Sequence, residues 1–212
     1  MSAAQALTLS EAGCVLNRAP ALLNNALDTG VIRARQRRVG SAVQRLLGSA
    51  EMRFLLVAER LDRDLTPKGR RRLYDAIRQL DDDAHSVSLG EIVLDLGKVD
   101  RDLEGRLERL EALRGWVEPA ADGTDPVVKD TRIPVYMVAA LARKQSVSEI
   151  GEDFPSLTDE QIEGAIEYAK AYPNRGRPYP TTSLKRVLAD LADLGAFDVS
   201  PYEKTASPRE IP

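Results

Sequence analysis

The stretch from Asp125 to Ala169 constrains the fold more than any other part of the chain. It opens with a short extended segment, Pro126 to Lys129, and then reaches Pro134, whose fixed φ suits the first turn of a helix. Thr158 and Gln161 have the spacing of a capping box at a further helix start. Apolar side chains recur at helical spacing in three runs, which are residues 135–142, 147–154 and 162–169. The pattern therefore predicts three short helices joined by tight turns, a trihelical module of the helix-turn-helix type.

Short motifs in this stretch also resemble a known family. The motifs are Pro126-Val-Val-Lys-Asp-Thr-Arg-Ile-Pro-Val-Tyr136, Ser146 with Glu149-Ile150, and Phe154-Pro155-x-Leu157-Thr158-x-Glu160-x-Ile162-x-x-Ala165. They are similar to a small bacterial family of winged-helix domains, first described as domains of unknown function, that lie beside PIN-like nucleases as VapB-type antitoxins. The resemblance implies an antitoxin that binds a toxin nuclease and represses its own operon.

Composition limits the classes of protein to which the chain can belong. A length of 212 residues with 43% hydrophobic content can bury a real core, in one large or two small domains, and the pattern favours two. Charged residues make up 30%, aromatic residues 5%, and the net charge is −3, which is typical of a soluble, helix-rich protein. No apolar run approaches membrane-spanning length, and a basic segment followed by an apolar one is lacking at the N-terminus. We therefore expect a cytoplasmic protein without membrane contact.

The chain is poor in residues that carry chemistry. A single cysteine, Cys14, excludes an intrachain disulfide, and a single histidine, His85, removes most catalytic triads and metal clusters. The sequence holds no nucleophile–base pair and no phosphate-cradling glycine loop. Three adjacent carboxylates at 81–83 lack other ligands at a defined spacing, so we interpret them as a solvated linker. We expect no enzyme, no catalytic residue, no metal and no cofactor.

The first part of the chain has the signals of two helices joined by a turn. We expect residues 1–7 to be frayed and Ser10 to cap the first helix. The second helix ends at Gly30, a left-handed cap. Its expected inner face carries four residues, which are Leu22, Leu23, Ala26 and Leu27.

A basic segment follows these helices. Val31 and Ile32 are extended and apolar, the run from Arg33 to Arg38 is basic, and apolar residues resume at Val39, which predicts a strand, a basic loop and a strand. Such a hairpin behind two helices is a wing. The order of elements resembles the MerR-like or excisionase-like winged helix, so we assign residues 1–80 to a winged helix-turn-helix DNA-binding domain.

Charge in the first part of the chain favours a polyanionic partner. Residues 1–45 contain six arginines and two acids, a local net charge of +4 in an acidic protein. Arginines of the wing would contact phosphates, and amides on the outer face of the second helix could pair with adenine in the major groove. The predicted DNA-binding residues are Arg18, Asn24, Asn25, Arg33, Arg35, Arg37 and Arg38. A solvated arginine-rich loop and ordinary surface asparagines are the alternative interpretation.

The middle of the chain is predicted to be helical, with a strand/helix connector at 81–124. Thr66-Pro67 restarts a helix, and its first turn is basic at 68–72, either as a DNA contact or as a solvated turn. One or two short strands interrupted by Gly90 follow, within one protomer or across a dimer. A leucine seam from Leu103 to Val117, with Trp116 beside it, closes either against the protein's own core or against a second copy. Residues 118–125 are interpreted as a linker.

The trihelical module, assigned to residues 125–173, differs in charge from the first part of the chain. Residues 146–170 carry seven acids and one base, a local net charge of −6. The outer face of the third helix holds Glu160, Glu163 and Glu167, which should repel phosphates. We therefore interpret this module as a surface for dimerisation or partner contact, although it has the order of a DNA-binding unit.

The tail, residues 174–212, combines a basic turn with an amphipathic helix. Arg175-Gly-Arg177-Pro is open to three interpretations: an exit turn, an arginine presented to the acidic pocket of a PIN-like nuclease, or an AT-hook in the minor groove. Apolar residues at helical spacing follow, either to dock a partner or to pack on their own domain. The predicted toxin-binding residues are Arg175, Arg177, Leu184, Leu188, Leu191 and Phe197.

The sequence therefore predicts a mainly α protein with an N-terminal winged helix-turn-helix and short β elements, a C-terminal trihelical winged-helix-like domain and a helical tail. Its favoured function is that of a homodimeric antitoxin that neutralises a PIN-like ribonuclease toxin and autoregulates its operon by binding operator DNA. The alternative is a stand-alone dimeric transcriptional regulator or adaptor without a toxin partner.

Overall fold

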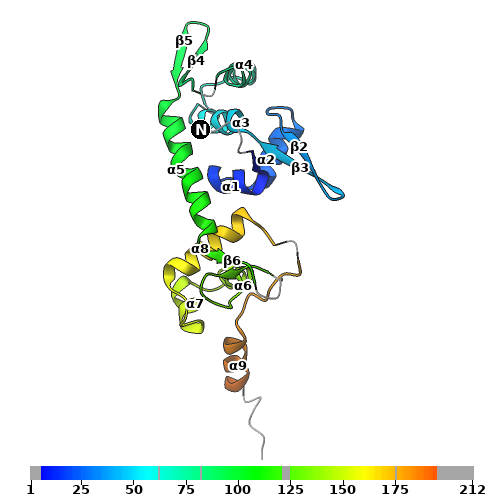
Figure 1. The fold of residues 1–212 in the computed structure, drawn as a ribbon, viewed down its shortest axis with the longest axis vertical. Coiled ribbons are helices and arrows are strands. Elements are labelled where there is room, and N and C mark those ends of the chain that lie inside the picture. Colours follow the sequence, from blue (N-terminus) through cyan, green and yellow to red (C-terminus); the bar gives the residue numbers. More distant parts are fainter. Residues whose placement is uncertain (1–5, 62, 82, 121–124, 175, 195–212) are drawn as a thin grey trace, which may run out of the picture.

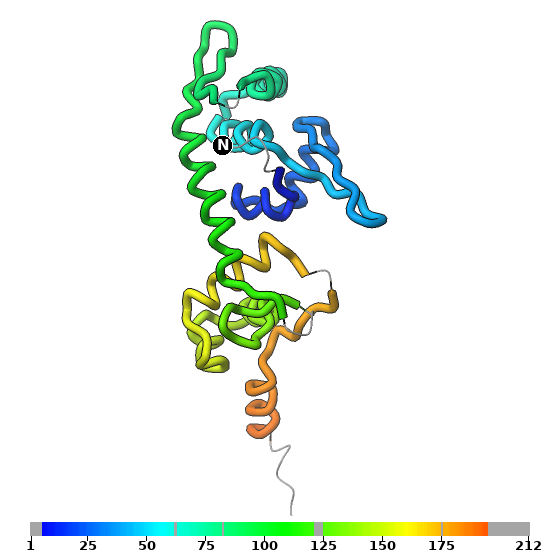
Figure 2. Tube along the Cα trace, in the orientation of Figure 1, coloured from blue at the N-terminus to red at the C-terminus, as the bar shows by residue number. Residues whose placement is uncertain are grey.

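The chain forms an elongated, mainly helical molecule along one long helix (Figure 1). The structure, a computed structural model, describes residues 6–61, 63–81, 83–120, 125–174 and 176–194. Helix α5 (Gly97–Arg114) runs from the N-terminal unit, where the wing and helices lie, to the trihelical unit at its other end. Figure 2 follows the chain from the first unit, down α5 and through the second unit to the tail helix α9 (Leu184–Asp193).

The N-terminal unit has the order of a winged helix. Its elements are β1 (Leu7–Thr8), α1 (Leu9–Leu16), α2 (Pro20–Asp28), β2 (Arg35–Val39) and β3 (Ala42–Leu47). The three strands form one antiparallel sheet in the order β1-β3-β2. The two helices and the hairpin confirm the predicted arrangement of helices followed by a wing.

The limits of the wing differ from the prediction. The basic residues form strand β2 itself instead of a loop, the turn lies at Gly40 with φ +61°, and Val31 and Ile32 precede the strand. Every side chain of β2 is exposed, so the strand has no buried face and its sequence lacks the alternation that marks a half-buried strand.

The start of the chain also differs from the prediction. Of residues 1–7, which were predicted to be frayed, residues 1–5 lie outside the described residues, and Leu7 is buried in β1, where it pairs with Leu47. The cap of α1 is Thr8 instead of Ser10: its Oγ1 accepts the Glu11 backbone N–H at 3.2 Å, and its own N–H donates to the Glu11 carboxylate at 2.8 Å. A capping box was therefore present two residues before the expected cap.

Two helices and a hairpin complete this unit. They are α3 (Ser49–Arg60), α4 (Pro67–Arg78), β4 (Ser86–Leu89) and β5 (Ile92–Asp95). Thr66 caps α4 through the Gly69 N–H at 3.1 Å, as the Thr-Pro signal predicts, and Gly90 makes the hairpin turn with φ +69°. Strands β4 and β5 pair within one protomer.

The leucine seam of α5 closes against the protein's own core. Leu103, Leu110 and Leu113 are buried in a cluster with residues of α1, α3 and α4. Of the two alternatives that the sequence left open, the protein's own core and a second copy of the chain, the structure therefore shows the first. The buried leucines are not available to a second copy.

The trihelical unit has the predicted helices and a small sheet. Strands β6 (Val117–Glu118) and β7 (Val127–Val128) pair antiparallel, followed by α6 (Val135–Leu141), α7 (Val147–Asp153) and α8 (Asp159–Ala171). The expected linker therefore contributes Glu118 to a strand. Six of the predicted inward residues are buried in a second core, together with Val128 and Leu157; the six are Val135, Val138, Leu141, Ile150, Ile162 and Ala165.

The two units are joined where α1, α5 and α8 meet (Figure 1). Trp116 lies at the end of α5, and its ring contacts Gly164 of α8 so closely that a Cβ there would lie 2.9 Å from the indole Cγ. Arg109 of α5 pairs with Glu167 of α8 at 2.6 Å. Tyr168 and Tyr172 of the α8 end pack against the first core, so both apolar and polar contacts fix the junction.

Candidate nucleic-acid and protein interfaces

The arginines of the wing are exposed but do not share one face. Arg33, Arg35, Arg37 and Arg38 are all exposed. Successive side chains of a strand point to opposite faces, so Arg35 and Arg37 lie on one face of β2 and Arg38 lies on the other. Arg37 Nη2 donates to Gln44 Oε1 across the hairpin at 2.8 Å. The wing can therefore present cations to a polyanion from either side.

The wing is tied to the helices behind it through Arg33. Its backbone N–H donates to the Tyr74 hydroxyl at 2.9 Å, and that hydroxyl donates to Glu51 Oε1 at 2.7 Å. Burial, together with the hydrogen bond to Glu51, raises the pKa of Tyr74 to about 12. The hydroxyl stays protonated at neutral pH and holds the first residue of the basic segment against α3 and α4.

Arg18 lies apart from the exposed arginines. It sits in the turn between α1 and α2, is 28% exposed, and pairs with Glu59 of α3 at 3.4 Å. Its charge is therefore partly compensated within the protein, whereas the wing arginines are open to solvent.

The two predicted asparagines of α2 have different surroundings. Asn24 accepts from Arg45 Nη1 at 2.7 Å and donates to Asp28 at 3.2 Å, so its amide links α2 to strand β3. Asn25 is exposed. Arg45 also pairs with Asp28 at 2.6 Å. The structure therefore places Asn25, rather than Asn24, on the open surface of the helix.

The open surface of α2 includes an apolar residue that the sequence placed inside. Leu22 is 58% exposed, whereas Leu23 is buried at 1%. The helix has only nine residues and buries a narrow stripe, so the expected inner face was too wide. Leu22 and Asn25 are three positions apart and share the outward face, a combination that suits contact with a thymine methyl group and a base edge.

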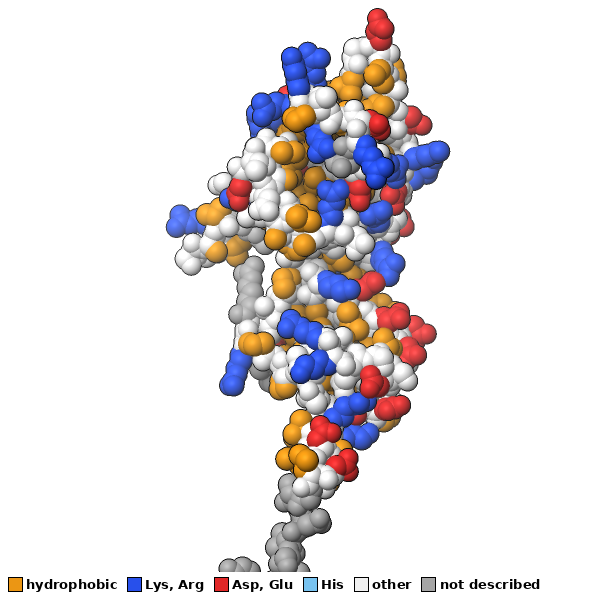
Figure 3. Space-filling model, turned by 180° about the vertical axis from the view of Figure 1, so that it is seen from behind, with side chains coloured by type: hydrophobic (Ala, Val, Ile, Leu, Met, Phe, Trp, Pro, Cys, Tyr) orange, Lys and Arg blue, Asp and Glu red, His pale blue; other side chains and the backbone are white. Residues whose placement is uncertain are grey.

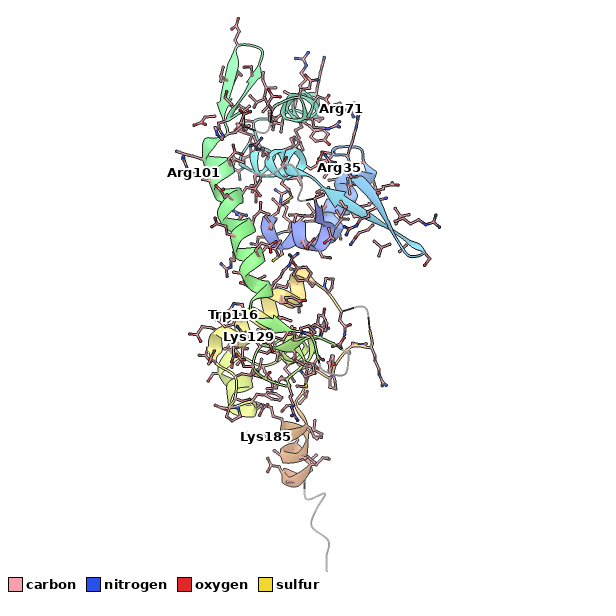
Figure 4. All side chains as sticks on the ribbon, viewed as in Figure 1. Arg35, Arg71, Arg101, Trp116, Lys129 and Lys185 are labelled. Carbon is pink, nitrogen blue, oxygen red and sulfur yellow. The ribbon has the colours of Figure 1, made fainter. Side chains whose placement is uncertain are left out.

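A second basic surface lies on α4. Lys68, Arg71 and Arg72 are exposed in its first turns. In Figure 4, Arg71 of α4 and Arg35 of β2 lie on the same side of the N-terminal unit. Figure 3, from the opposite side, shows Lys and Arg side chains over the N-terminal unit and the wing tip, and acidic side chains gathered along one edge of the trihelical unit. The basic side chains of the wing and of α4 therefore lie on a different unit from this acidic edge, while both units also carry side chains of the other sign.

The acidic face of α8 is narrower than the sequence suggested. Glu160 and Glu163 are exposed, but the Glu167 side chain is 34% exposed and is occupied by its ion pair with Arg109. Of the three carboxylates predicted to face solvent, only those of Glu160 and Glu163 therefore do so without an ion pair to Arg109.

The tail helix presents an apolar stripe to solvent. Leu184, Leu188 and Leu191 are 73%, 45% and 39% exposed, and no residue from Leu184 to Asp193 is buried. The structure therefore does not pack this stripe on its own domain. Arg177 is exposed, while Arg175 and Phe197 lie outside the described residues.

Polar contacts hold α9 to the trihelical unit. Asp153 at the end of α7 accepts from Ser183 Oγ at 2.5 Å, from Arg186 Nε at 3.1 Å and from Gln145 Nε2 at 3.0 Å. Burial would raise the pKa of the Asp153 carboxyl, but three hydrogen bonds, with that from Ser183 first among them, outweigh burial and lower it. These hydrogen bonds could not be predicted from the sequence, because the donors lie 8 to 33 positions from Asp153 and no short motif connects them.

The described residues contain no candidate metal centre. Among them, no group of three or more His, Cys, Asp or Glu side chains is placed to hold an ion. His85 is 68% exposed and lies 2.9 Å from Asp100. Across the same described ranges, none of the helices has the length and apolar character needed to cross a bilayer.

Comparison with known proteins supports a family for one part of the chain. Residues 117–169 match the family described as "Protein of unknown function (DUF433)". This range corresponds to the trihelical unit and begins at strand β6. The resemblance found in the sequence motifs is therefore confirmed at the level of a domain of unknown function.

A longer relative is also similar to the chain. It is named "Uncharacterized protein y4eO", from Sinorhizobium fredii (strain NBRC 101917 / NGR234), and is 41% identical over 105 residues. The alignment covers 48% of this chain and 44% of that protein, so less than half of the relative's length is represented. No solved structure matches the chain.

Proposed function

We propose that the chain binds duplex DNA through its winged helix, with α2 in the major groove and the β2–β3 wing on the phosphate backbone. The observation that carries this proposal is the three-stranded winged arrangement with exposed arginines along β2. Guanidinium groups bind phosphate oxygens in bidentate fashion and release counterions, which supplies affinity without sequence preference. Leu22 and Asn25 of α2 are the base-reading candidates.

Salt dependence of binding tests this proposal. Replacement of Arg35 and Arg37 by Gln should make the slope of log affinity against log salt shallower by about 1.8, since each lost phosphate contact accounts for about 0.9. Arg143→Gln, an exposed arginine of the trihelical unit, is the matched control and should leave the slope unchanged. Unchanged slopes in the wing variant, measured by fluorescence anisotropy on the neighbouring promoter DNA, would contradict DNA binding by the wing.

The acidic trihelical unit should not contribute to this affinity. A variant with Glu160→Gln and Glu163→Gln removes the two solvent-facing carboxylates of α8. DNA affinity should remain nearly the same, because phosphates would approach the opposite, basic unit. A loss of affinity in this variant would show that the trihelical unit contacts DNA.

We further propose that the chain is an antitoxin and that α9 docks a PIN-like ribonuclease toxin. Two features support this: the motifs of the trihelical unit, which resemble those of domains found in VapB-type antitoxins, and the unburied apolar stripe of α9. An amphipathic helix laid into a partner's groove uses residues at such spacing as anchors. Arg177 is exposed, precedes this helix by seven residues, and could bind an acidic nuclease pocket.

Co-expression with the neighbouring open reading frame tests the antitoxin role. A small nuclease with an acidic site should co-purify and be silent in the complex. Leu188→Asp with Leu191→Asp should abolish capture, while Ile92→Asp, an apolar residue 62% exposed on the distant hairpin, should not. Capture that survives the α9 variant would place the toxin contact elsewhere. Autonomous DNA binding as a homodimer without any co-purifying nuclease would favour the alternative, a stand-alone transcriptional regulator.

A further inference from the structure

We infer that the cleft between the α1–α2 turn and helices α5 and α8 binds a small organic anion. Such a ligand would have an apolar body and either a carboxylate or a phosphate group. The cleft has a volume of about 610 Å³ and lies where α1, α5 and α8 meet. Its walls come from both units: eight residues between Ser10 and Pro20 and part of helix α5 on one side, and Glu167 and Lys170 of α8 on the other. Clefts between units, with few polar groups around an apolar floor, are common sites for small ligands.

The floor of the cleft is apolar. Val15 of α1 and Leu110 and Leu113 of α5 line it, and each is at most 4% exposed. Ala19 and Pro20, at the start of α2, add further apolar surface. An aromatic or branched aliphatic group would bury its surface mainly against the exposed Ala19 and Pro20, because the three floor side chains have little accessible surface left.

The charged groups around this floor favour an anion. Among the described residues, four cationic side chains line the cleft against one carboxylate, that of Glu167. The cations are Arg18, Arg106, Arg109 and Lys170.

These cations differ in how far the protein compensates them. Arg18 pairs with Glu59 at 3.4 Å, and Arg106 is held by Asp102 at 2.9 Å and donates to the Val15 carbonyl at 3.0 Å. Their guanidinium groups are therefore already engaged and mainly shape the wall.

Arg109 and Lys170 are the groups that a ligand would reach. Arg109 makes two hydrogen bonds to Glu167, at 2.6 Å and 3.2 Å, while its side chain is 71% exposed. Lys170 follows Glu167 by three residues on α8, so its ammonium group belongs to the same helix face. The acid group of a ligand would bridge these two cations and share Arg109 with Glu167.

Cys14 provides a built-in reporter of occupancy. It is the single cysteine of the chain, it lines the cleft, and it is partly buried. Burial raises the pKa of its thiol, the Glu167 carboxylate raises it further, and Lys170 and Arg109 oppose the shift. Cys14 lines the same cleft as Arg109 and Lys170, so an occupant held by these cations would shield the thiol.

Occupancy would also reach the DNA-binding helix, a consequence that rests on the proposed function. The cleft wall includes Asn17, which holds a left-handed conformation with φ 52°, and the residues that lead into α2. Gly13 faces the same turn, where a Cβ would lie 2.7 Å from the Arg18 carbonyl oxygen. A turn this tight transmits a displacement of its wall directly to the start of α2.

Alkylation of Cys14 tests the site without reference to DNA. The full chain is treated with N-ethylmaleimide, an uncharged reagent, and the modified fraction is followed by intact mass. Competitors are phenyl phosphate, phenylacetate and the uncharged phenylacetamide. Saturable protection by either anion, but not by the amide, is the expected result, and the anion that protects at lower concentration identifies the preferred acid group.

Variants connect any protection to the proposed cations. Lys170→Met should raise the half-protecting concentration about tenfold, the scale of one charge-assisted hydrogen bond. Lys170→Arg should retain protection. Lys144→Met, an exposed lysine outside the cleft, is the control and should have no effect.

Three results would overturn the inference: no protection by either anion, equal protection by the amide, or protection that Lys170→Met leaves intact. If protection is found but the protein binds no duplex, the ligand site stands and the proposed function fails. If the protein binds duplex DNA but neither anion protects Cys14 from alkylation, the proposed function stands and the ligand site fails.

Discussion

Loss of the Asp153 carboxylate should release the tail helix from the molecule without unfolding the rest. No residue of α9 from Leu184 to Asp193 is buried, so polar contacts rather than apolar burial hold it in place. The Asp153 side chain is only 4% exposed and accepts hydrogen bonds from Gln145 and Ser183, at 3.0 Å and 2.5 Å. Asp153→Ala leaves both donors without this acceptor. Gln145 belongs to the trihelical unit itself, so of these two bonds only that from Ser183, the N-cap of α9, joins the tail helix to the unit. A hydrogen bond to a charged acceptor contributes about 1.5–3 kcal/mol, which is the expected loss in the docking free energy.

Hydrogen exchange of the α9 amides measures this loss. A helix of 10 residues is only marginally stable by itself, so detachment should also melt it. Protection of these amides should fall by between about 10-fold and 150-fold, while the α3 and α5 amides keep theirs. Glu152→Gln is the matched control, because its carboxylate is 70% exposed and lies 4.0 Å from Arg186. Unchanged α9 protection in Asp153→Ala would refute the view that this carboxylate anchors the helix.

The same anchor has a defined pH dependence. The pKa of Asp153 is lowered in the folded protein, so the folded state favours the ionised form. Its contribution is therefore fully present above the ordinary carboxyl pKa of about 4 and is lost as the pH falls through the folded-state value. Protection of α9, corrected for intrinsic exchange, should decrease in this acidic range and remain constant from there to neutral pH.

Three further substitutions test the packing. Leu103→Ala in the buried seam of α5 should lower the free energy of unfolding by about 2–5 kcal/mol in urea titration, and a loss below 1 kcal/mol would contradict its burial at 0% exposure. Gly164→Ala should displace the ring of Trp116, the single tryptophan, giving a fluorescence shift and a loss of about 1–3 kcal/mol, whereas an unchanged emission spectrum would contradict the close contact. Tyr74→Phe should cost about 1–2 kcal/mol at neutral pH by leaving the Arg33 N–H without its acceptor. The raised pKa of Tyr74 makes its stabilisation present below pH 10 and lost as pH rises toward 12, so the fall in stability over that range should be smaller in Tyr74→Phe.

The elements that local signals specify were predicted well. Thr158 with Gln161 forms the capping box that starts α8, and Thr66-Pro67 starts α4. A cap is a contact between residues three positions apart, so it can be recognised without knowledge of the fold. The same reasoning explains why the trihelical core, with Val135, Ile150 and Ile162 inward, agrees with the helical periodicity.

The elements without a local signal were misplaced. Strand β2 is exposed on both faces, so its arginine run lacked the alternation of a strand and was predicted to be a loop. Leu22 satisfied the periodicity of an inner face, yet α2 contacts its neighbours along a stripe too narrow to cover it. In both cases the packing of neighbouring elements determined which side chains are exposed, and the spacing of apolar residues along the chain carries no information about that packing.

The sequence alone determined the helical class, the separation of basic and acidic segments along the chain, and the motifs of the trihelical unit. These features depend on composition, on charge, and on residues three or four positions apart, all of which can be read without knowledge of the fold. Only the tertiary structure decided which asparagine of α2 is open, that the α5 seam faces its own core, that α9 leaves its apolar stripe uncovered, and that Cys14, Arg109 and Lys170 share one cleft. Those outcomes depend on contacts between residues far apart in the chain, and such contacts are set by how whole helices pack against one another.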